Sequence, residues 1–356
     1  MRQGKAKYVF PGSNTPSGFV SFYREGLSNI ERLFILKGGP GTGKSTLMRK
    51  IGLAMLERGY DVEFWQCSSD NDSLDGILIT DLSVAVIDGT APHIIDPLYP
   101  GAVDEIINLG EHWDDTYLRE HKTEIIKLSQ EIARHFELCY DKLAQAGQVR
   151  QQQSQLVQKC RAEEQIESVI QDLLQKIFTG QAAVKRRLFA SAITPRGLVS
   201  LAEAISRPYA ERYILRGPLG SGKEKLLEAI ANQAEECGHS LEVYFNALNP
   251  QQIELVALPE LGIAIVDGGE QICEGNKSEQ VIDFSNFLTA INLETAEDLT
   301  ERCQALVAEA TNALIEAKAR HDRLESYYCK AMDFAAVDET GNRIFHKILA
   351  WAAEKR

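Results

Sequence analysis

Long apolar runs are missing from this chain of 356 residues. No stretch approaches the roughly 18 consecutive apolar residues of a membrane-spanning helix, and the segment 1–7 leads into no apolar signal-peptide core. The seven cysteines include no CxxC pair and no histidine–cysteine cluster at zinc spacing, which favours free thiols over a disulfide framework. These absences exclude a disulfide-rich secreted domain and predict a cytoplasmic protein.

An excess of basic residues is also missing, because the formal net charge is −13. This charge argues against duplex DNA, other nucleic acid or an anionic membrane surface as the main partner. The apolar and charged fractions, 44% and 25%, are typical of a soluble globular protein. A chain of this length can bury two separate cores, so two domains are expected.

What the sequence does contain is a complete phosphate-binding motif of the Walker A type, Gly38-x-x-x-x-Gly43-Lys44-Ser45. Glycines in such a loop can adopt positive φ and bring successive N–H groups toward a phosphate. Lys44 is expected to reach the β- and γ-phosphates, and the Ser45 hydroxyl is expected to bind Mg²⁺. The residues expected to bind nucleotide here are Gly38, Gly39, Pro40, Gly41, Thr42, Gly43, Lys44, Ser45 and Thr46.

The motif has the context that a functional loop requires. An apolar, strand-like run at 33–36 precedes it, and residues 46–58 carry apolar side chains at helical spacing. A strand before the loop and a helix after it place the positive end of the helix dipole beside the phosphates. The sequence therefore predicts a nucleotide-binding site.

A second, related loop occurs at 213–223. Shifting the chain against itself by 179 residues aligns the two halves without a gap over about eighty positions, and the alignment places Asp104 on Asp283. This repeat is too long for a solenoid and predicts a duplicated domain, with domains at 1–179 and 180–356. The second loop adds four candidate phosphate-binding residues, Gly217, Gly220, Gly222 and Lys223.

Each half is expected to be an α/β domain with a mostly parallel sheet flanked by helices. Thr15 and Thr194, each followed by proline, are predicted to cap a short helix. Heptad-like spacing in the first half, and a 4–3 rhythm of apolar and small residues over 299–324 in the second, predict an antiparallel helical hairpin that extends from each core and is able to engage a protein partner. Helices that simply cover the sheet are the alternative. The expected strands are 61–67, 83–88 and 104–109, with 241–245, 262–267 and 281–284 in the second half, and the hairpin helices are 114–146 and 153–178.

Asp88 ends an apolar strand 44 residues after Lys44, where a Walker B aspartate is expected. There it would hold Mg²⁺ through water and Ser45. The alternative is a strand-end aspartate that starts an Asp-Gly turn. The next residue is Gly89, so the glutamate that polarises water in many ATPases is absent from this position.

Two polar stretches are candidates for the remaining chemistry. Asp70 and Asp72 follow the second strand and could accept a proton or orient water, or could form a turn that caps a short helix. His93 and Asp96 lie in a long proline-rich connection at the same edge of the sheet. A solvated histidine is the alternative interpretation of His93.

The motif at 38–45 together with Asp88 resembles the P-loop NTPase superfamily. The tandem cores, the segment 88–93 and the helical extensions are similar to a family of uncharacterised bacterial proteins with tandem ATPase-like domains. This resemblance implies the fold and ATP binding, and it implies no substrate. The transporter signature Leu-Ser-Gly-Gly-Gln and a guanine-reading motif are both absent from the sequence, so adenine is the default base.

The second half departs from the motif at two positions. Glu224 stands where Ser45 stands in the first half, and Pro218 replaces Gly39. A carboxylate beside the β-phosphate would repel it, and proline removes a backbone donor. The second loop is therefore expected to keep its fold with a degenerate site.

The leading hypothesis is a Mg²⁺-dependent, ATP-binding hydrolase whose site lies in the first half, with a regulatory or structural second half. A small-molecule or nucleotide kinase is one alternative, because acids follow the second strand while a glutamate after Asp88 is missing. A nucleotide-dependent binding module or scaffold with negligible turnover is the other.

Overall fold

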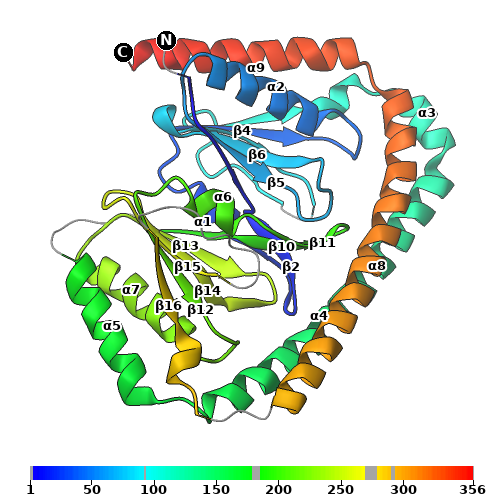
Figure 1. The fold of residues 1–356 in the computed structure, drawn as a ribbon. Helices are drawn as coiled ribbons and strands as arrows, with labels where there is room; N and C mark the ends of the chain where they lie inside the picture. The colour runs from blue at the N-terminus through cyan, green and yellow to red at the C-terminus, as the bar shows by residue number, and fades with distance from the viewer. Residues whose placement is uncertain (1–2, 92–93, 179–184, 269–278, 290–292, 356) are drawn as a thin grey trace. The chain divides into compact units, whose positions relative to one another are not determined.

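The computed structural model describes residues 3–91, 94–178, 185–268, 279–289 and 293–355, and it shows an α/β fold. The chain forms two compact units (Figure 1). Unit 1 comprises Met1–Pro11, Leu27–Leu138 and Asn312–Arg356, and unit 2 comprises Gly12–Gly26 and Cys139–Thr311. Among the described residues, no helix combines the length and the apolar character needed to cross a membrane.

Unit 1 is built on a six-stranded mixed sheet. Most neighbouring strands are parallel, as expected. An extra strand, β6, lies between the predicted strands β5 and β7 and is antiparallel to both. The sequence predicted a turn and a short helix there. All six residues of β6 are buried, so a strand inside the sheet removes more apolar surface from water than an exposed helix would. In sheet order the strands are β1 (Ala6–Val9), β5 (Val62–Gln66), β6 (Leu74–Ile79), β7 (Val84–Asp88), β4 (Arg32–Lys37) and β8 (Asp104–Asn108).

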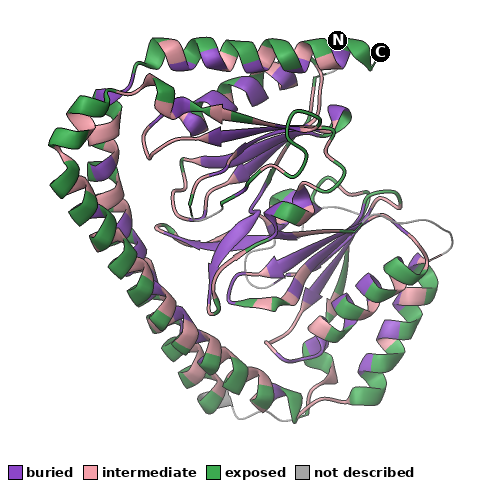
Figure 2. Ribbon diagram, turned by 180° about the vertical axis from the view of Figure 1, so that it is seen from behind, coloured by how far each residue is buried: buried purple, intermediate pink, exposed green. Residues whose placement is uncertain are grey.

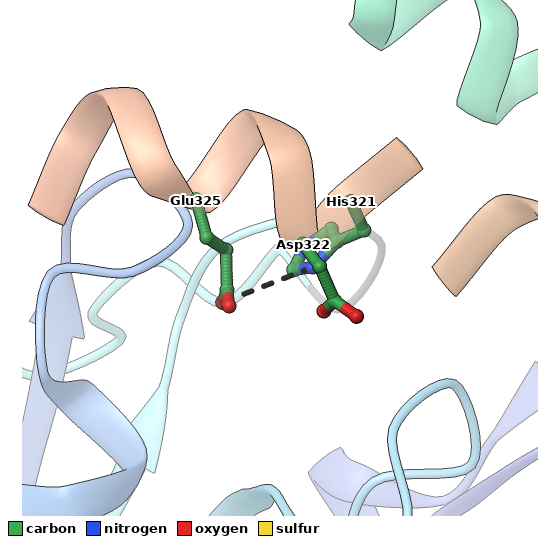
Figure 3. Close-up of side chains that lie close together, drawn as sticks. All are labelled: His321, Asp322 and Glu325. Atoms are coloured by element: carbon green, nitrogen blue, oxygen red, sulfur yellow. Dashed lines mark ion pairs between the residues drawn. The ribbon is translucent and has the colours of Figure 1, made fainter. Parts of the chain in front are cut away.

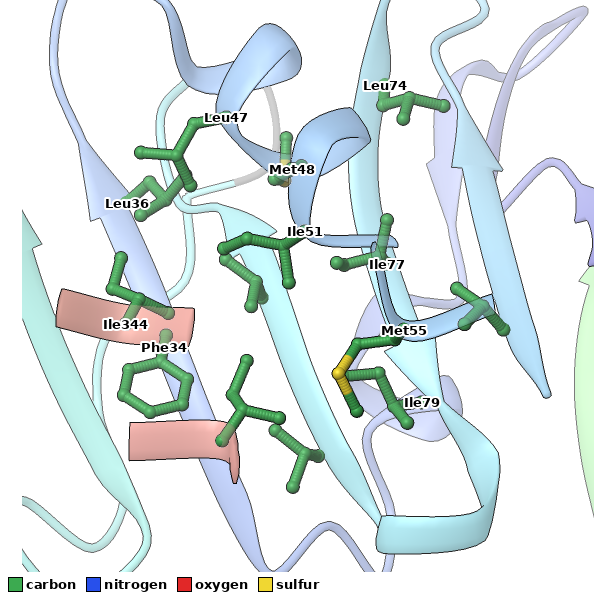
Figure 4. Close-up of a cluster of buried hydrophobic side chains, with 14 of the residues drawn as sticks. Phe34, Leu36, Leu47, Met48, Ile51, Met55, Leu74, Ile77, Ile79 and Ile344 are labelled. Carbon is green, nitrogen blue, oxygen red and sulfur yellow. The ribbon is translucent and has the colours of Figure 1, made fainter. Parts of the chain in front are cut away.

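Two helices complete the core of unit 1. Helix α2 (Lys44–Glu57) lies against the sheet, and α9 (Phe334–Glu354) packs on α2. Leu47 and Ile51 of α2 belong to one buried cluster with Phe34 of β4 and Ile344 of α9 (Figure 4). The 3–4 residue spacing of the apolar side chains on α2 gives it one buried face, as the sequence predicted.

Unit 2 contains a second six-stranded sheet with the same strand order at an offset of 179 residues. Helix α7 (Lys223–Glu236) lies against this sheet, and α5 (Glu163–Ile177) packs on α7. The strands, in the corresponding order, are β9 (Lys185–Phe189), β13 (Leu241–Asn246), β14 (Asn249–Leu258), β15 (Ile263–Asp267), β12 (Glu211–Arg216) and β16 (Glu279–Asp283).

The offset changes before the last strand of the repeat. Lys37 pairs with Asn108, and its counterpart Arg216 pairs with Asp283, so the offset there is 283 minus 108, or 175. The predicted equivalence of Asp104 and Asp283 is therefore wrong. Asn108 and Asp283 are the true counterparts, since each side chain accepts a backbone N–H at the start of a 3₁₀ turn.

The two Thr-Pro segments form β-hairpins, and the predicted helix caps are wrong. Thr15 Oγ1 donates to the Gly18 carbonyl at 2.7 Å and accepts from Ser17 N at 3.1 Å. Proline at the second turn position and Gly18 at φ 89° suit a tight turn between strands. The hairpins form a sheet in unit 2 in the order β11 (Gly197–Ser200), β10 (Ser191–Thr194), β2 (Gly12–Thr15) and β3 (Gly18–Ser21).

The hairpins pair through equivalent residues. Asn14 of β2 lies opposite Ile193 of β10, and 193 minus 14 is the repeat offset of 179. The Asn14 side chain donates to the Ile193 carbonyl at 2.9 Å and accepts from Tyr140 Oη at 3.1 Å. Self-pairing of equivalent positions is the pattern of a local two-fold axis between two copies of one motif.

The long helices differ from the predicted hairpin. Helix α4 (Lys122–Gln158) continues through the predicted turn near 147–152, and it packs along α8 (Leu293–Ala331) instead of folding back on α5. Figure 2 shows exposed residues along both long helices, whereas the strands of both sheets are largely buried. The shorter helices are α1 (Tyr23–Gly26), α3 (Asp115–Glu120) and α6 (Ala202–Ser206), with 3₁₀ turns at Thr80–Leu82, Leu109–His112 and Phe284–Phe287.

The compact units cross the predicted boundary between residues 179 and 180. Unit 1 combines the sheet of the first sequence half with α9 and the end of α8 from the second half. Unit 2 combines the sheet of the second half with α5 and the end of α4 from the first half. Apolar spacing identifies the buried face of a helix, but it does not identify the surface that covers that face.

Candidate functional site

The first glycine loop, residues 38–45, connects β4 to α2 in unit 1. Gly41 and Gly43 have φ of 69° and 87°, as expected for glycines of a phosphate-binding loop. The expectation of positive φ is not met at Gly38. Glycine is needed there for space, since a Cβ would lie 2.8 Å from Thr42 Oγ1.

Lys44 begins α2 and turns its side chain back over the loop. Its Nζ donates to the carbonyl oxygens of Gly38, at 3.0 Å, and Gly39, at 2.7 Å. The same atom lies 3.6 Å from Asp88 Oδ2, and the Lys44 side chain is only 9% exposed. A largely buried cation at a helix N-terminus provides a strong local attraction for an anion.

Asp88 stands at the end of β7, in register with Leu36 of β4. Its Oδ1 accepts from Thr90 N at 2.9 Å and from Thr90 Oγ1 at 2.5 Å, which is the turn expected of a strand-end aspartate. Its Oδ2 faces Lys44. The Oδ1 contacts are those of the turn interpretation, and Mg²⁺ binding by Asp88 stays a prediction.

Ser45 lies in the first turn of α2, and its Oγ accepts from Leu74 N of β6 at 2.9 Å. A hydroxyl oxygen has a second lone pair, so this hydrogen bond leaves it able to act as a metal ligand. With the Asp88 carboxylate on the neighbouring strand, the donor set is the hard oxygen type that Mg²⁺ prefers. The residues present therefore fit the metal expected from the motif.

The acids after β5 take different roles. Asp70 Oδ1 accepts from Asp72 N at 3.1 Å, which closes a turn, and Asp70 Oδ2 lies 3.3 Å from Lys318 Nζ of α8. Asp72 is exposed and precedes β6, so the predicted helix cap is wrong. His93 lies outside the described residues, and Asp96 is an exposed partner of Lys37 at 3.2 Å.

Helix α8 lies directly against the first glycine loop. A Cβ at Gly39 would lie 2.5 Å from the Tyr328 ring, and a Cβ at Gly41 would lie 2.9 Å from Cys329 Sγ. Cys329 Sγ also donates to the Gly41 carbonyl at 3.3 Å. Sequence analysis missed these contacts, because nothing in the 4–3 rhythm of 299–324 indicates a packing partner 288 residues earlier in the chain.

Asp75 of β6 is a buried acid that sequence analysis also missed, since β6 itself was not predicted. Burial raises the pKa of the neighbouring Cys67 thiol well above its ordinary value, and the charge of Asp75 raises it further. Cys67 is therefore a protonated thiol at neutral pH, with little nucleophilic character.

One group of potential metal ligands occurs among the described residues, on α8 (Figure 3). Ligand atoms of His321, Asp322 and Glu325 lie within 4.8 Å of one another. The Lys318 ammonium bonds to Asp322, and its charge opposes a cation at this place. The Ser45 and Asp88 oxygens are better metal-binding candidates, because they stand beside the glycine loop.

The second glycine loop, residues 217–224, has its three glycines at φ of 121°, 86° and 114°. Its lysine is arranged differently from Lys44. Lys223 Nζ donates to Asp267 Oδ1 at 2.7 Å, and the two side chains are 6% and 18% exposed. A lysine engaged in a close buried ion pair is less available to a phosphate than one held by carbonyl oxygens.

Arg161 binds the second glycine loop from the segment between α4 and α5. Its Nε donates to the Gly220 carbonyl at 2.5 Å, its Nη2 bonds to Glu224 Oε1, and its side chain is 5% exposed. The predicted repulsion between Glu224 and phosphate is therefore only part of the reason why the second loop is a poor phosphate site. The carboxylate is neutralised, and an incoming phosphate would have to compete with an internal ion pair.

Arg161→Ala is expected to destabilise unit 2 by roughly 3 kcal/mol, because it leaves the largely buried Glu224 carboxylate without its charged partner. Arg207→Ala removes an exposed arginine from a surface pair and serves as the control. Chemical denaturation of both variants measures the difference. Equal stability of the two variants would show that the Arg161 contacts contribute nothing to the fold.

Comparisons of this chain with protein-family models, with curated proteins and with solved structures found no match. The functional assignment therefore depends on the residues and the geometry described above.

Proposed function

We propose that this protein is an ATP-binding P-loop NTPase that hydrolyses ATP at the first glycine loop. The observation that carries the proposal is the position of Lys44. It begins α2, lies over a loop in which Gly41 and Gly43 have positive φ, and stands 3.6 Å from a carboxylate on the adjacent strand. A helix N-terminus, glycine backbone and a buried lysine together provide the attraction that a triphosphate requires.

Each residue of the first loop has a proposed role. Lys44 would exchange its carbonyl partners for phosphate oxygens, which are stronger acceptors. Ser45 and Asp88 would hold Mg²⁺, which neutralises phosphate charge when bound. Thr42 keeps the loop in shape, since its Oγ1 donates to the Gly39 carbonyl at 2.9 Å.

The second half is proposed to be structural or regulatory. Its lysine is paired with Asp267, and its metal-ligand position is Glu224, which is paired with Arg161. Release of both pairs would be needed before Mg-ATP could bind in the same way. The tight internal pairing favours a role in stabilising unit 2.

Phosphate release and ADP formation separate the proposal from its alternatives. Steady release of inorganic phosphate from Mg-ATP, with no added substrate, supports a hydrolase. ADP that forms only after a second substrate is added would indicate a kinase, and tight binding without either product would indicate a nucleotide-dependent scaffold. Absence of nucleotide binding would refute the proposal itself.

Asp70→Asn is expected to lower ATP turnover by roughly a hundredfold while leaving nucleotide affinity unchanged. The substitution keeps the size of the side chain and removes the basicity and the charge that faces Lys318. Asp72→Asn is the matched control, because Asp72 is exposed two residues later. If Asp70→Asn turns over ATP at the same rate as the control, Asp70 serves only to form the turn.

A further inference from the structure

One face of α8 extends along the first site in unit 1. Lys318, His321, Glu325 and Tyr328 recur every three or four residues, so their side chains share that face. At one end Lys318 contacts Asp70, and at the other end Glu325 and Cys329 contact Gly41. Lys318 and Cys329 are eleven residues apart, or about 16 Å along a helix.

The two contacts place His321 above the edge of the sheet where ligands bind. Asp70 follows β5, and the glycine loop follows β4, so both lie beyond the carboxyl ends of strands. Ligands of open α/β sheets bind at this edge. His321 lies between the two contacts on the same helix face, in the stretch of α8 that runs from Asp70 to the glycine loop.

The equivalent position in unit 2 supports this placement. Two isolated β-bridges, Trp113–Met332 and Arg161–Leu288, correspond to each other across the repeat, so that Met332 matches Arg161. The offset for the helical segments is therefore 332 minus 161, or 171. At this offset the counterpart of His321 is Arg150.

Arg150 interacts with the charge at the end of the corresponding strand. Burial lowers the pKa of Arg150, and the charges of Cys303, Asp267 and Glu254 act in the opposite direction. Asp267 is the counterpart of Asp88. The helix position shared by Arg150 and His321 therefore carries a basic side chain in both units.

A carboxylate on the same helix lies near the His321 ring. Its Nδ1 lies 3.8 Å from Glu325 Oε1, as the dashed line in Figure 3 marks. Nδ1 is buried and, among the described residues, has no hydrogen-bond partner. Glu325 lies on the Nδ1 side of the ring, so the second ring nitrogen is directed away from Glu325.

We propose that His321, carried on a helix from the second half of the sequence, contacts the terminal phosphate of the nucleotide at the first glycine loop. This inference rests on the proposed function. A donor at the terminal phosphate stabilises the charge that develops there during phosphoryl transfer. The site would then be composite, with its loop from residues 38–45 and its phosphate-sensing side chain from α8.

Calorimetry with two nucleotides tests the proposal on the full chain. Mg-ADP lacks the terminal phosphate, whereas the Mg²⁺ complex of a non-hydrolysable ATP analogue retains it. His321→Ala is expected to weaken binding of the analogue about tenfold and to leave ADP affinity unchanged. His321→Gln, which can still donate a hydrogen bond, is expected to recover part of the loss, and His346→Ala, an exposed histidine on α9, is the control.

The binding results separate the inference about His321 from the proposed function. Loss confined to the analogue supports contact with the terminal phosphate. Equal weakening for both nucleotides, or no change for either, overturns the inference while the proposed function stands, provided that the unmodified protein binds both. If the unmodified protein binds neither nucleotide, the proposed function fails and the inference fails with it.

Discussion

Lys44→Ala is expected to reduce Mg-ATP affinity by about a hundredfold or more and to abolish turnover. Lys44 is the cation placed at the loop: its Nζ is held at 3.0 Å and 2.7 Å by the Gly38 and Gly39 carbonyls, and its side chain is almost fully buried. A charged donor in such surroundings contributes more to phosphate binding than an exposed one, because solvent screens it less. Equilibrium binding of a labelled nucleotide measures the loss.

The matched control is Lys50→Ala on the same helix. Lys50 pairs with Asp338, and both side chains are 61% exposed, so its removal changes the net charge of unit 1 by the same amount without touching the loop. Affinity in this variant should stay within about twofold of the unmodified protein. Circular dichroism of both variants confirms the fold. Undiminished binding by folded Lys44→Ala would show that the loop is not the nucleotide site.

Lys223→Ala is expected to have the opposite effect, with unchanged nucleotide binding and a stability loss of roughly 3 kcal/mol. The Lys223–Asp267 pair is close, at 2.7 Å, and largely buried, so removal of the lysine takes a close charged partner away from the aspartate. Lys44 lies farther from Asp88, at 3.6 Å, and should contribute less to stability. The two substitutions therefore separate a binding lysine from a structural one.

Calorimetry and chemical denaturation of the same samples test this asymmetry. We expect one Mg-ATP site per chain, lost in Lys44→Ala and retained in Lys223→Ala. The denaturation midpoint should fall further in Lys223→Ala than in Lys44→Ala. Two equivalent sites, or a single site that Lys223→Ala removes, would contradict the assignment of nucleotide binding to the first half of the chain.

Several features could be predicted from local sequence. The strand, glycine loop and helix around Lys44 follow from an apolar run, three glycines and helical apolar spacing. The repeat offset of 179 identified corresponding strands in both halves before the last strand shifted it to 175. Local signals failed where one pattern suits two structures. Thr-Pro can cap a helix or turn a hairpin, and only strand pairing at Asn14 and Ile193 selects the hairpin.

By itself, the sequence determined the features that depend on local backbone conformation and local chemistry. These are the glycine loops, their lysines and the strand-end aspartates. Only the tertiary structure decided which helix covers which sheet. The physical reason is that an apolar helix face gains similar free energy against any complementary apolar surface, so partner choice depends on the whole set of packed surfaces. For the same reason Tyr328, Cys329 and Arg161 became visible at the glycine loops only through contacts between segments far apart in the chain.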